Sequence, residues 1–494
     1  MAALLNRLKS VPTPQALAAV LAIAIAARFA GLGSSLWYDE VTTLLKFVRL
    51  PVQELVANFS SLNNHPFYSL AAKAAIAAFG ESAQSLRLPA ALFGIGAIAA
   101  FWPIARRAAT PQLSLLTLLL LALSYHHVWF SQNARGYTML LFWTTISTTL
   151  FIIGARKNSM AIWAGYGVVF AAAMYTHLSA AFSFAAHGAI YAAVLLRRGY
   201  RRQNGGSVLS GWPPFVGMAL GLALTILVYA PMLGDMTATF GGVRQSAPTE
   251  PLAHWKDPSF VVANLLGQIV SLGPFMAFAL PPAAMLILFG AYRIARKDGL
   301  LAAIYVLQIP ITIAVLQFAD MRIWPRYFFV EIAFLYLALV VGVFAAIDLV
   351  CDFAKGRWRI EKSRPLLAGL ASVAMIAGSL SLLARNYAAP KQDLAGAVAA
   401  VERLAGPLDV KSVYGVVAEP VIGYYAPDWM ELSPAMIEVS PRTKRIWTVI
   451  AFRDQVSASD PAAWAAFERE FELVERFPGT LGGGGVFVYR SKTP

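Results

Sequence analysis

Long runs of apolar residues recur along the first 390 residues of the chain, and short polar or basic segments separate them. A helix that crosses a membrane needs about 20 mostly apolar residues. Eleven runs meet this requirement and predict spans at 15–32, 88–105, 111–129, 134–154, 160–176, 178–196, 212–233, 274–294, 300–319, 326–348 and 365–385. The stretches 66–80 and 259–273 are shorter or more broken and predict surface helices, but 13 spans result if both cross.

The last hundred residues have a different pattern, which predicts a small folded domain. Helical periodicity alternates there with short segments rich in β-branched and aromatic residues. The expected helices are 392–405 and 461–475, and the expected strands are 411–417, 445–452 and 485–490. The predicted boundary therefore divides the chain into a membrane domain, 1–390, and an α/β domain, 391–494.

Basic residues set the direction in which the chain crosses. With eleven alternating spans, one side receives 18 Lys and Arg residues in six clusters, and the other side receives nine before the last span ends. Basic loops stay in the cytoplasm, so the N-terminus is expected inside and residues 386–494 outside. A cleaved signal peptide is the alternative for the first run. The predicted fold class is a polytopic α-helical membrane protein with a C-terminal extracytoplasmic α/β domain.

The composition supports a membrane protein and argues against an ordinary soluble protein. Only 13% of the 494 residues are charged and the mean hydropathy is +0.61, whereas soluble domains carry about 25% charged residues. The net charge of +14 would suggest a nucleic-acid partner in a soluble protein. Residues 1–390 hold 29 basic and 13 acidic residues, however, so membrane orientation accounts for the excess and no nucleic acid is expected. The single cysteine, Cys351, excludes a disulfide within the chain and a cysteine metal cluster.

Two adjacent carboxylates, Asp39 and Glu40, follow the first span on the predicted outer face. A carboxylate at this place could act as a general base or a cation ligand, and a solvated loop is the alternative. His65 stands before Pro66 at a helix start, where it could bind an anion or simply cap the helix.

Cationic residues and histidines occur on the same face. Arg135, in the tight loop Ser131–Tyr137, needs a carboxylate or phosphate partner near the bilayer, and an ion pair with Asp39 or Glu40 is the alternative to a substrate contact. His177 and His254 could be structural or functional. Arg322 and Arg326 could hold a lipid phosphate or anchor the chain among the headgroups.

The order of these motifs resembles that of the membrane-embedded GT-C glycosyltransferases, in particular the bacterial relatives of protein O-mannosyltransferases and of the lipid A aminoarabinose transferase. The resemblance rests on Asp-Glu after the first span, His-Pro-aromatic, Arg-Leu-Pro-Ala, Ser-Gln-Asn-Ala-Arg-Gly-Tyr, Tyr-Thr-His and a late Arg-Tyr. It implies catalytic roles for Asp39 and Glu40. It implies substrate contacts for His65, Arg87, Arg135, Tyr137, His177, Arg322, Arg326 and Tyr327. No cofactor is certain, and a divalent metal at Glu40 and His254 stays open.

The resemblance also implies a function in a bacterial inner membrane, with the active site on the periplasmic side. The expected activity is inverting transfer of a monosaccharide from a polyprenyl-phosphate-linked donor to an acceptor, which lipid A, a polysaccharide or a protein could provide. A transporter or flippase for a lipid-linked or sugar substrate is the alternative, and a sensor or scaffold is a third reading. The sequence identifies neither the sugar nor the acceptor.

Overall fold

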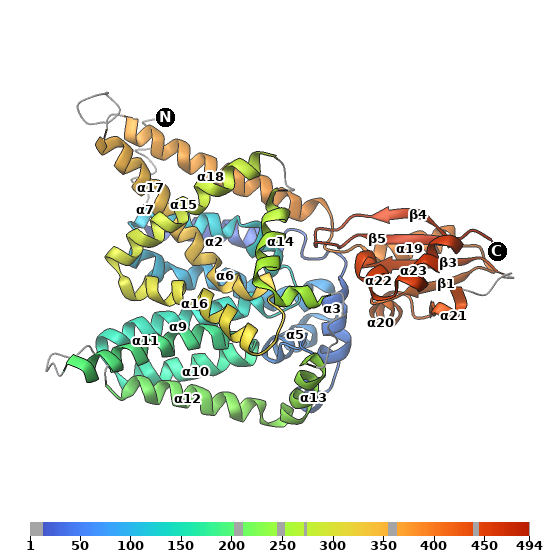
Figure 1. Ribbon diagram of the computed structural model, residues 1–494, viewed down its shortest axis with the longest axis horizontal. Coiled ribbons are helices and arrows are strands. Elements are labelled where there is room, and N and C mark those ends of the chain that lie inside the picture. The colour runs from blue at the N-terminus through green and yellow to red at the C-terminus, as the bar shows by residue number, and fades with distance from the viewer. Residues whose placement is uncertain are drawn as a thin grey trace.

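The computed structural model describes residues 13–201, 211–244, 252–270, 274–353, 363–437 and 444–493. A bundle of helices makes up most of the molecule, and a small sheet domain lies at one end of it (Figure 1). The helices that match the predicted spans are α2 (Thr13–Phe29), α6 (Ala83–Ala108), the bent pair α7 (Pro111–Ala122) and α8 (Tyr125–Ser131), α9 (Tyr137–Lys157), α10 (Met160–Thr176), α11 (Ala180–Arg201), α12 (Pro213–Tyr229), α15 (Pro274–Lys297), α16 (Gly299–Phe318), α17 (Ile332–Phe353) and α18 (Arg364–Ala388).

All eleven predicted spans coincide with helices. Within the described residues, eight helical runs are long and apolar enough to cross a membrane, or nine if α7 and α8 form one span bent by 56°. The two others, α2 and α10, have 17 residues each. The chain therefore has the predicted polytopic helical architecture.

Shorter helices occupy the end of the bundle that faces the sheet domain (Figure 1). Among them, α5 and α14 match the apolar stretches 66–80 and 259–273, and Pro66 at the first position of α5 is a normal helix start. Their reading as surface helices stays a prediction. The set comprises α3 (Tyr38–Thr43), η1 (Leu44–Val48), α4 (Val52–Leu55), α5 (Pro66–Phe79), η3 (Ala230–Met232), α13 (Leu233–Arg244), η4 (Ala253–Lys256), α14 (Pro258–Val270) and η5 (Pro325–Glu331).

Basic residues from separate loops meet at the opposite end of the bundle, which we call the basic end. Asp298 caps α16 by accepting from the Leu301 amide at 3.1 Å. The same carboxylate pairs with Arg107, at the end of α6, and lies 3.7 Å from Arg156, at the end of α9. Three loops that were predicted to lie on one side therefore do lie together, which supports the alternation of the spans.

The sheet domain contains five strands in the order β2-β1-β3-β5-β4. Parallel pairs join β1 to β2 and to β3, and antiparallel pairs join β3 to β5 and β5 to β4. One core lies between the sheet and α19, and a second, centred on Phe467 of α23, lies on other sheet side chains. The elements are α19 (Leu394–Leu404), β1 (Val410–Tyr414), α20 (Ala418–Pro420), η7 (Val421–Tyr425), β2 (Met430–Glu431), α21 (Pro434–Ile437), β3 (Ile446–Ala451), α22 (Arg453–Ser459), α23 (Pro461–Glu470), β4 (Phe471–Phe477) and β5 (Val486–Ser491).

One sequence expectation in this domain is wrong. The helix expected at 461–475 ends at Glu470, and Phe471 begins strand β4. The segment 471–477 pairs along β5, and Phe471 is buried at 2% exposure. Backbone pairing with a neighbouring strand outweighs the helical preference of its Glu and Leu residues, because strand formation depends on tertiary context.

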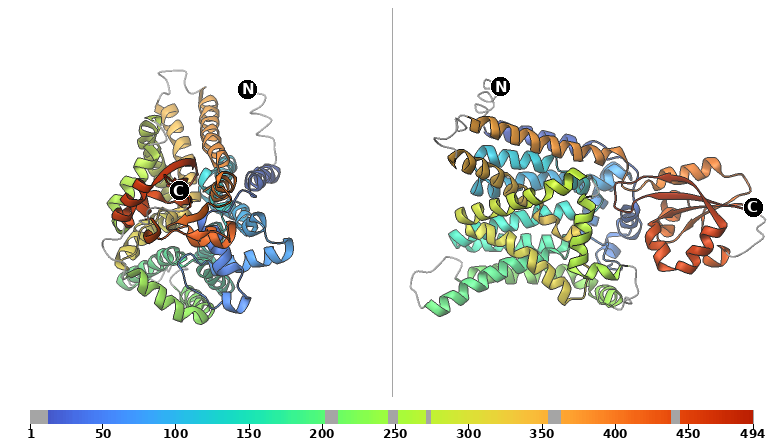
Figure 2. Two further views of the ribbon diagram at one scale, coloured as in Figure 1. Left: turned by 90° about the vertical axis from the view of Figure 1, so that its right-hand side faces the viewer. Right: turned by 45° about the horizontal axis from the view of Figure 1, so that its top comes forward.

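The sheet domain contacts the segment that carries the acidic pair. Lys46 of η1 pairs with Glu419 of α20 at 2.8 Å, and the Tyr425 hydroxyl donates to the Leu36 carbonyl at 2.7 Å. The Tyr38 amide donates to Gln392 Oε1 at 3.2 Å. The right-hand view of Figure 2 shows the sheet domain beyond the ends of the long helices. These contacts place the C-terminal domain against the segment that carries Asp39 and Glu40.

Candidate active site

The acidic pair lies in the first turn of α3, which begins at Tyr38. Consecutive residues of a helix point about 100° apart, so Asp39 and Glu40 face different surroundings. The Asp39 side chain is 15% exposed, whereas the Glu40 side chain is completely buried. The two carboxylates therefore belong to two separate polar clusters.

Glu40 forms a buried, bidentate ion pair with Arg87 of α6. The guanidinium reaches Glu40 Oε1 with Nε at 2.7 Å and Oε2 with Nη2 at 2.5 Å. The Ala134 amide also donates to Oε1, at 2.7 Å, and the Trp37 amide donates to Oε2, at 3.3 Å. Burial raises the pKa of Glu40, but the charge and hydrogen bonds of Arg87 act more strongly together and lower it overall.

Arg87 is equally saturated. Besides Glu40, its guanidinium donates to the carbonyls of Leu32, Ser34 and Ser35 at distances of 2.7 to 3.0 Å. A bidentate guanidinium–carboxylate pair with every other donor satisfied is a strong structural contact. This geometry joins the start of α6 to the segment before α3 and leaves no donor directed at a substrate.

Asp39 pairs with Arg135 instead. Arg135 Nη1 donates to Asp39 Oδ2, so the ion pair that the sequence offered as an alternative is present. Arg135 Nε and Nη2 lie 3.2 and 3.1 Å from His65 Nε2. Because a guanidinium can only donate, His65 Nε2 must be the acceptor and the imidazole must be neutral. Within the described part of the chain, Asp39 Oδ1 has no hydrogen-bond donor.

Two histidines flank this ion pair. The His65 and His177 rings have centroids 4.6 Å apart, and Tyr137 lies 5.2 Å from the first ring and 5.5 Å from the second. Burial lowers the pKa of His177 to about 3, and the nearby charges of Arg135 and Arg326 act in the same direction. Burial likewise holds the pKa of His65 well below its ordinary value. Both rings are therefore neutral at physiological pH.

Glycine at position 136 makes this packing possible. A Cβ atom there would lie 3.0 Å from His65 Nδ1 and 2.9 Å from Thr176 Cγ2. The backbone between Arg135 and Tyr137 thus passes close to the histidine. This is the physical reason for an Arg-Gly-Tyr sequence at the site.

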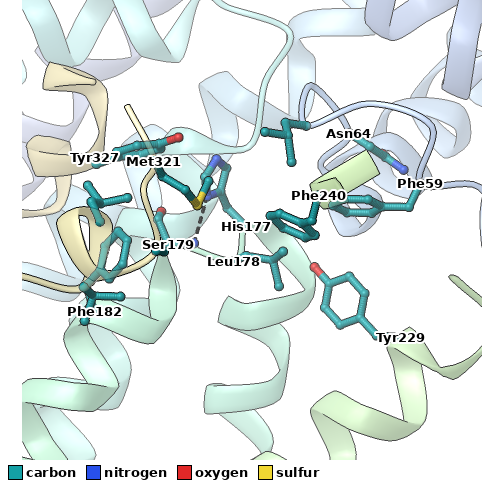
Figure 3. A pocket seen from close by; sticks show the side chains of 14 residues that line it. Phe59, Asn64, His177, Leu178, Ser179, Phe182, Tyr229, Phe240, Met321 and Tyr327 are labelled. Carbon is teal, nitrogen blue, oxygen red and sulfur yellow. Dashed lines mark hydrogen bonds between the residues drawn. The ribbon is translucent and has the colours of Figure 1, made fainter. Parts of the chain in front are cut away.

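An apolar cavity of about 190 Å³ adjoins the histidines. His177 and Tyr327 line one part of it, and the rings of Phe59, Phe240 and Tyr229 lie on the other side of His177 (Figure 3). The Ser179 amide donates to His177 Nδ1 at 3.0 Å and fixes the orientation of the ring. The cavity can therefore accept an apolar group whose polar end meets the Asp39 cluster.

Arg326 is the second cation near Asp39. It follows Pro325 at the start of η5, and its guanidinium lies 4.8 Å from the centre of the Trp324 ring. Within the described residues no carboxylate is paired with it. Arg322 lies in the connection between α16 and η5, four residues before it. The structure therefore brings together Asp39, His65, Arg135, Tyr137, His177, Arg326 and Tyr327.

The residues named for a metal do not come together. Both Glu40 oxygens are engaged by Arg87 and by backbone amides, and His254 packs against Phe260 with ring centroids 4.3 Å apart. Among the described residues, no group of three or more His, Cys, Asp or Glu side chains is arranged to hold an ion. A divalent ion held by Glu40 and His254 thus does not fit these side chains.

The sequence did not reveal one element of the site, the segment that leads into the sheet domain. Lys391 Nζ donates to the Gln132 carbonyl at 2.5 Å, and the Asn386 amide donates to Gln132 Oε1 at 2.8 Å. Burial lowers the pKa of Lys391 to about 7. This contact supports the loop that carries Arg135. Only the polar composition of the Ser131–Tyr137 loop hinted that it needed partners.

Comparisons with known proteins agree with this fold. A family model described as dolichyl-phosphate-mannose-protein mannosyltransferase matches residues 63–230, and no curated protein matches the chain. The chain is similar to apo ArnT from Cupriavidus metallidurans, with 14% identity, a TM-score of 0.50 and coverage of 96% of this chain and 97% of that chain. It is also similar to the archaeal oligosaccharyltransferase AglB from Archaeoglobus fulgidus, with 13% identity, a TM-score of 0.51 and coverage of 96% and 74%. The resemblance to the GT-C glycosyltransferases is thereby confirmed at the level of the fold.

Proposed function

We propose that the chain is a membrane glycosyltransferase that moves a monosaccharide from a polyprenyl-phosphate carrier to an acceptor outside the membrane. One observation carries the proposal: Asp39 pairs with Arg135 and interacts electrostatically with a second cation, Arg326, and the neighbouring His177 and Tyr327 line an apolar cavity. The site then faces the periplasm of a bacterial inner membrane. The sheet domain, residues 391–494, lies on the same side and adjoins the acceptor.

Asp39 is the proposed general base. It takes the proton from an acceptor hydroxyl as the acceptor oxygen attacks the anomeric carbon of the sugar. The bond from that carbon to the phosphate oxygen breaks, and the polyprenyl phosphate leaves with the bonding electrons. Positioned base catalysis of this kind contributes about 10²–10⁴-fold. Arg135 holds Asp39 Oδ2, so Oδ1 is the oxygen that faces the acceptor.

Arg326 and Arg135 are the proposed ligands of the leaving phosphate. Guanidinium groups bind phosphate through two parallel hydrogen bonds, and they stabilise negative charge as it develops. The apolar cavity lined by His177 and Tyr327 suits the first isoprenoid units of the carrier. The structure of AglB is described as a complex with a dolichol-phosphate and an inhibitory peptide, which is the same class of lipid carrier.

The expected stereochemical outcome is inversion at the anomeric carbon. A retaining mechanism through a covalent intermediate needs a second carboxylate near the sugar as nucleophile. The nearest candidate, Glu40, is fully buried and closed by Arg87. Direct displacement with Asp39 as the general base is therefore favoured.

The test uses the full-length protein in liposomes with a radiolabelled polyprenyl-phosphate sugar and a panel of lipid, glycan and protein acceptors. We expect label in one acceptor class and free polyprenyl phosphate as the second product. Movement of the label across the bilayer without transfer would overturn the proposal in favour of a flippase. Absence of both activities with every donor and acceptor would also contradict it.

A further inference from the structure

A second hollow lies at the basic end of the bundle, at the membrane face opposite to Asp39. It has a volume of about 520 Å³, and residues from α15, α17 and the connection between α6 and α7 line it. We call it the basic slot. Its cations are Arg293, Arg296 and Lys297, and its apolar wall includes Leu113, Val341 and Phe344.

Two glycines lie where α15 and α17 cross, next to the slot. A Cβ atom on Gly290 would lie 1.8 Å from the Ala338 carbonyl oxygen, and one on Gly342 would lie 1.9 Å from the Leu286 carbonyl oxygen. The backbones of α15 and α17 therefore approach closely at this crossing, as small residues allow. Further along, side chains of both helices line the basic slot.

Among the described residues, the slot holds more positive than negative side chains. Asp348 is the one carboxylate in its lining, and it pairs with Arg364 at 2.6 Å. The nearby Asp298 pairs with Arg107. Within the described residues, neither Arg293 nor Arg296 has an acidic partner. Lys297 Nζ donates to the Ala108 carbonyl at 3.3 Å, which leaves further donors on that ammonium group.

The slot lies where a phospholipid headgroup would lie. Both α15 and α17 are long enough to cross a membrane, and both end beside the slot. Protein covers only 11% of the most apolar window of α15, and Met285, Leu288 and Tyr292 on that helix are more than half exposed. The open face of α15 therefore faces lipid, and the slot continues this face to the membrane surface.

We propose that the basic slot binds an anionic phospholipid of the leaflet at this end of the bundle. Its phosphate would bridge the guanidinium groups of Arg293 and Arg296, and an acyl chain would lie against Val341 and Phe344. Charge complementarity and the continuous apolar wall favour a lipid over a free phosphate ion. The bound lipid stabilises the weakly covered helix α15 against α17.

The test measures binding of dioleoylphosphatidylglycerol to the purified full-length protein by native mass spectrometry. The double variant Arg293→Gln/Arg296→Gln should weaken binding about 10-fold or more, since each basic residue at a membrane surface contributes to anionic lipid binding. The control Lys157→Gln/Arg197→Gln removes two exposed cations from the same end, outside the slot, and should change binding less than about 2-fold. Equal losses in both double variants would overturn the proposal.

Thermal unfolding in nanodiscs distinguishes a binding defect from misfolding. Phosphatidylglycerol should raise the Tm of the wild type relative to phosphatidylcholine discs, and this increase should be absent in Arg293→Gln/Arg296→Gln. Both proteins should unfold at the same temperature in phosphatidylcholine alone. A lower Tm of the variant in phosphatidylcholine, or full displacement of the lipid by millimolar inorganic phosphate, would contradict a phospholipid site.

Discussion

Asp39 and Glu40 are adjacent in the sequence, but the polar clusters around them differ in burial and in hydrogen bonding. Glu40 and Arg87 are completely buried, and backbone groups saturate both side chains. Asp39 is partly exposed, keeps one oxygen without a donor in the described structure, and lies near a second cation. The comparison shows that two adjacent carboxylates can lie in opposite environments, one in a saturated buried ion pair and the other with an oxygen left for a further partner.

The difference extends to the arginines. Arg87 donates to Glu40 and to the carbonyls of Leu32, Ser34 and Ser35, and it therefore joins α6 to α3 and to the segment before it. Its expected substrate contact stays a prediction. Arg135 contacts a carboxylate and a neutral histidine, and it lies in a loop supported from the distant C-terminal region. The following substitutions test this division.

Replacing Asp39, the proposed general base, should have the largest effect, and this effect is on turnover. Asp39→Asn keeps the size of the side chain and an oxygen for Arg135 but cannot accept a proton. We expect turnover in the liposome assay to fall by about 10²–10⁴-fold, with little change in Tm. Glu81→Gln is the matched control, because it ends an exposed ion pair with Arg49 and should leave turnover unchanged. Near-normal turnover by Asp39→Asn would remove Asp39 from the mechanism.

Replacing the buried carboxylate should affect stability. Glu40→Gln leaves the Arg87 charge buried without a counter-charge, and we expect the free energy of unfolding in detergent to fall by about 3–5 kcal/mol. The double variant Glu40→Gln/Arg87→Gln should lose less than the sum of the single losses, because the two groups interact directly. A Glu40→Gln protein of normal stability that lacks transfer activity would instead place Glu40 in the chemistry.

The smallest expected effect is the loss of stability that His177 causes when the pH falls. His177 has a pKa of about 3 when folded and an ordinary value of 6.5. Between these values the unfolded chain binds a proton that the folded chain does not, so acid destabilises the protein and stability is restored as the pH rises to 6.5. Moving from pH 7 to 5.5 should cost about 1 kcal/mol through His177. His177→Gln should lose correspondingly less over the same interval, and identical losses would contradict a neutral His177.

Local sequence patterns were sufficient to predict the membrane helices, but they were insufficient to predict the polar side-chain clusters. The segment 160–176 forms α10 as expected, because apolar length alone predicts a span and depends on no partner. Strand β4 was missed because its identity depends on pairing with β5. The structural role of Glu40 could not be read from its neighbours either, since Arg87 lies 47 residues away.

The site residues divide in the same manner. Motif order on one membrane face was enough to propose that Asp39, His65, Arg135 and His177 act together, and the structure brings them together. Nothing in the sequence linked Lys391 to this group, because 259 residues separate it from Gln132. Contacts over such distances have no periodic signature and become visible only in three dimensions.

The link between Lys391 and Gln132 has a consequence for how the protein is made. Synthesis proceeds from the N-terminus, so the loop that carries Arg135 enters the membrane long before residues 386–391 leave the ribosome. A nascent chain can therefore hold almost all of its spans while this loop lacks its support. The Arg135 loop receives this support only after residues 386–391 have been translated, so insertion of the preceding helices comes before completion of the candidate site.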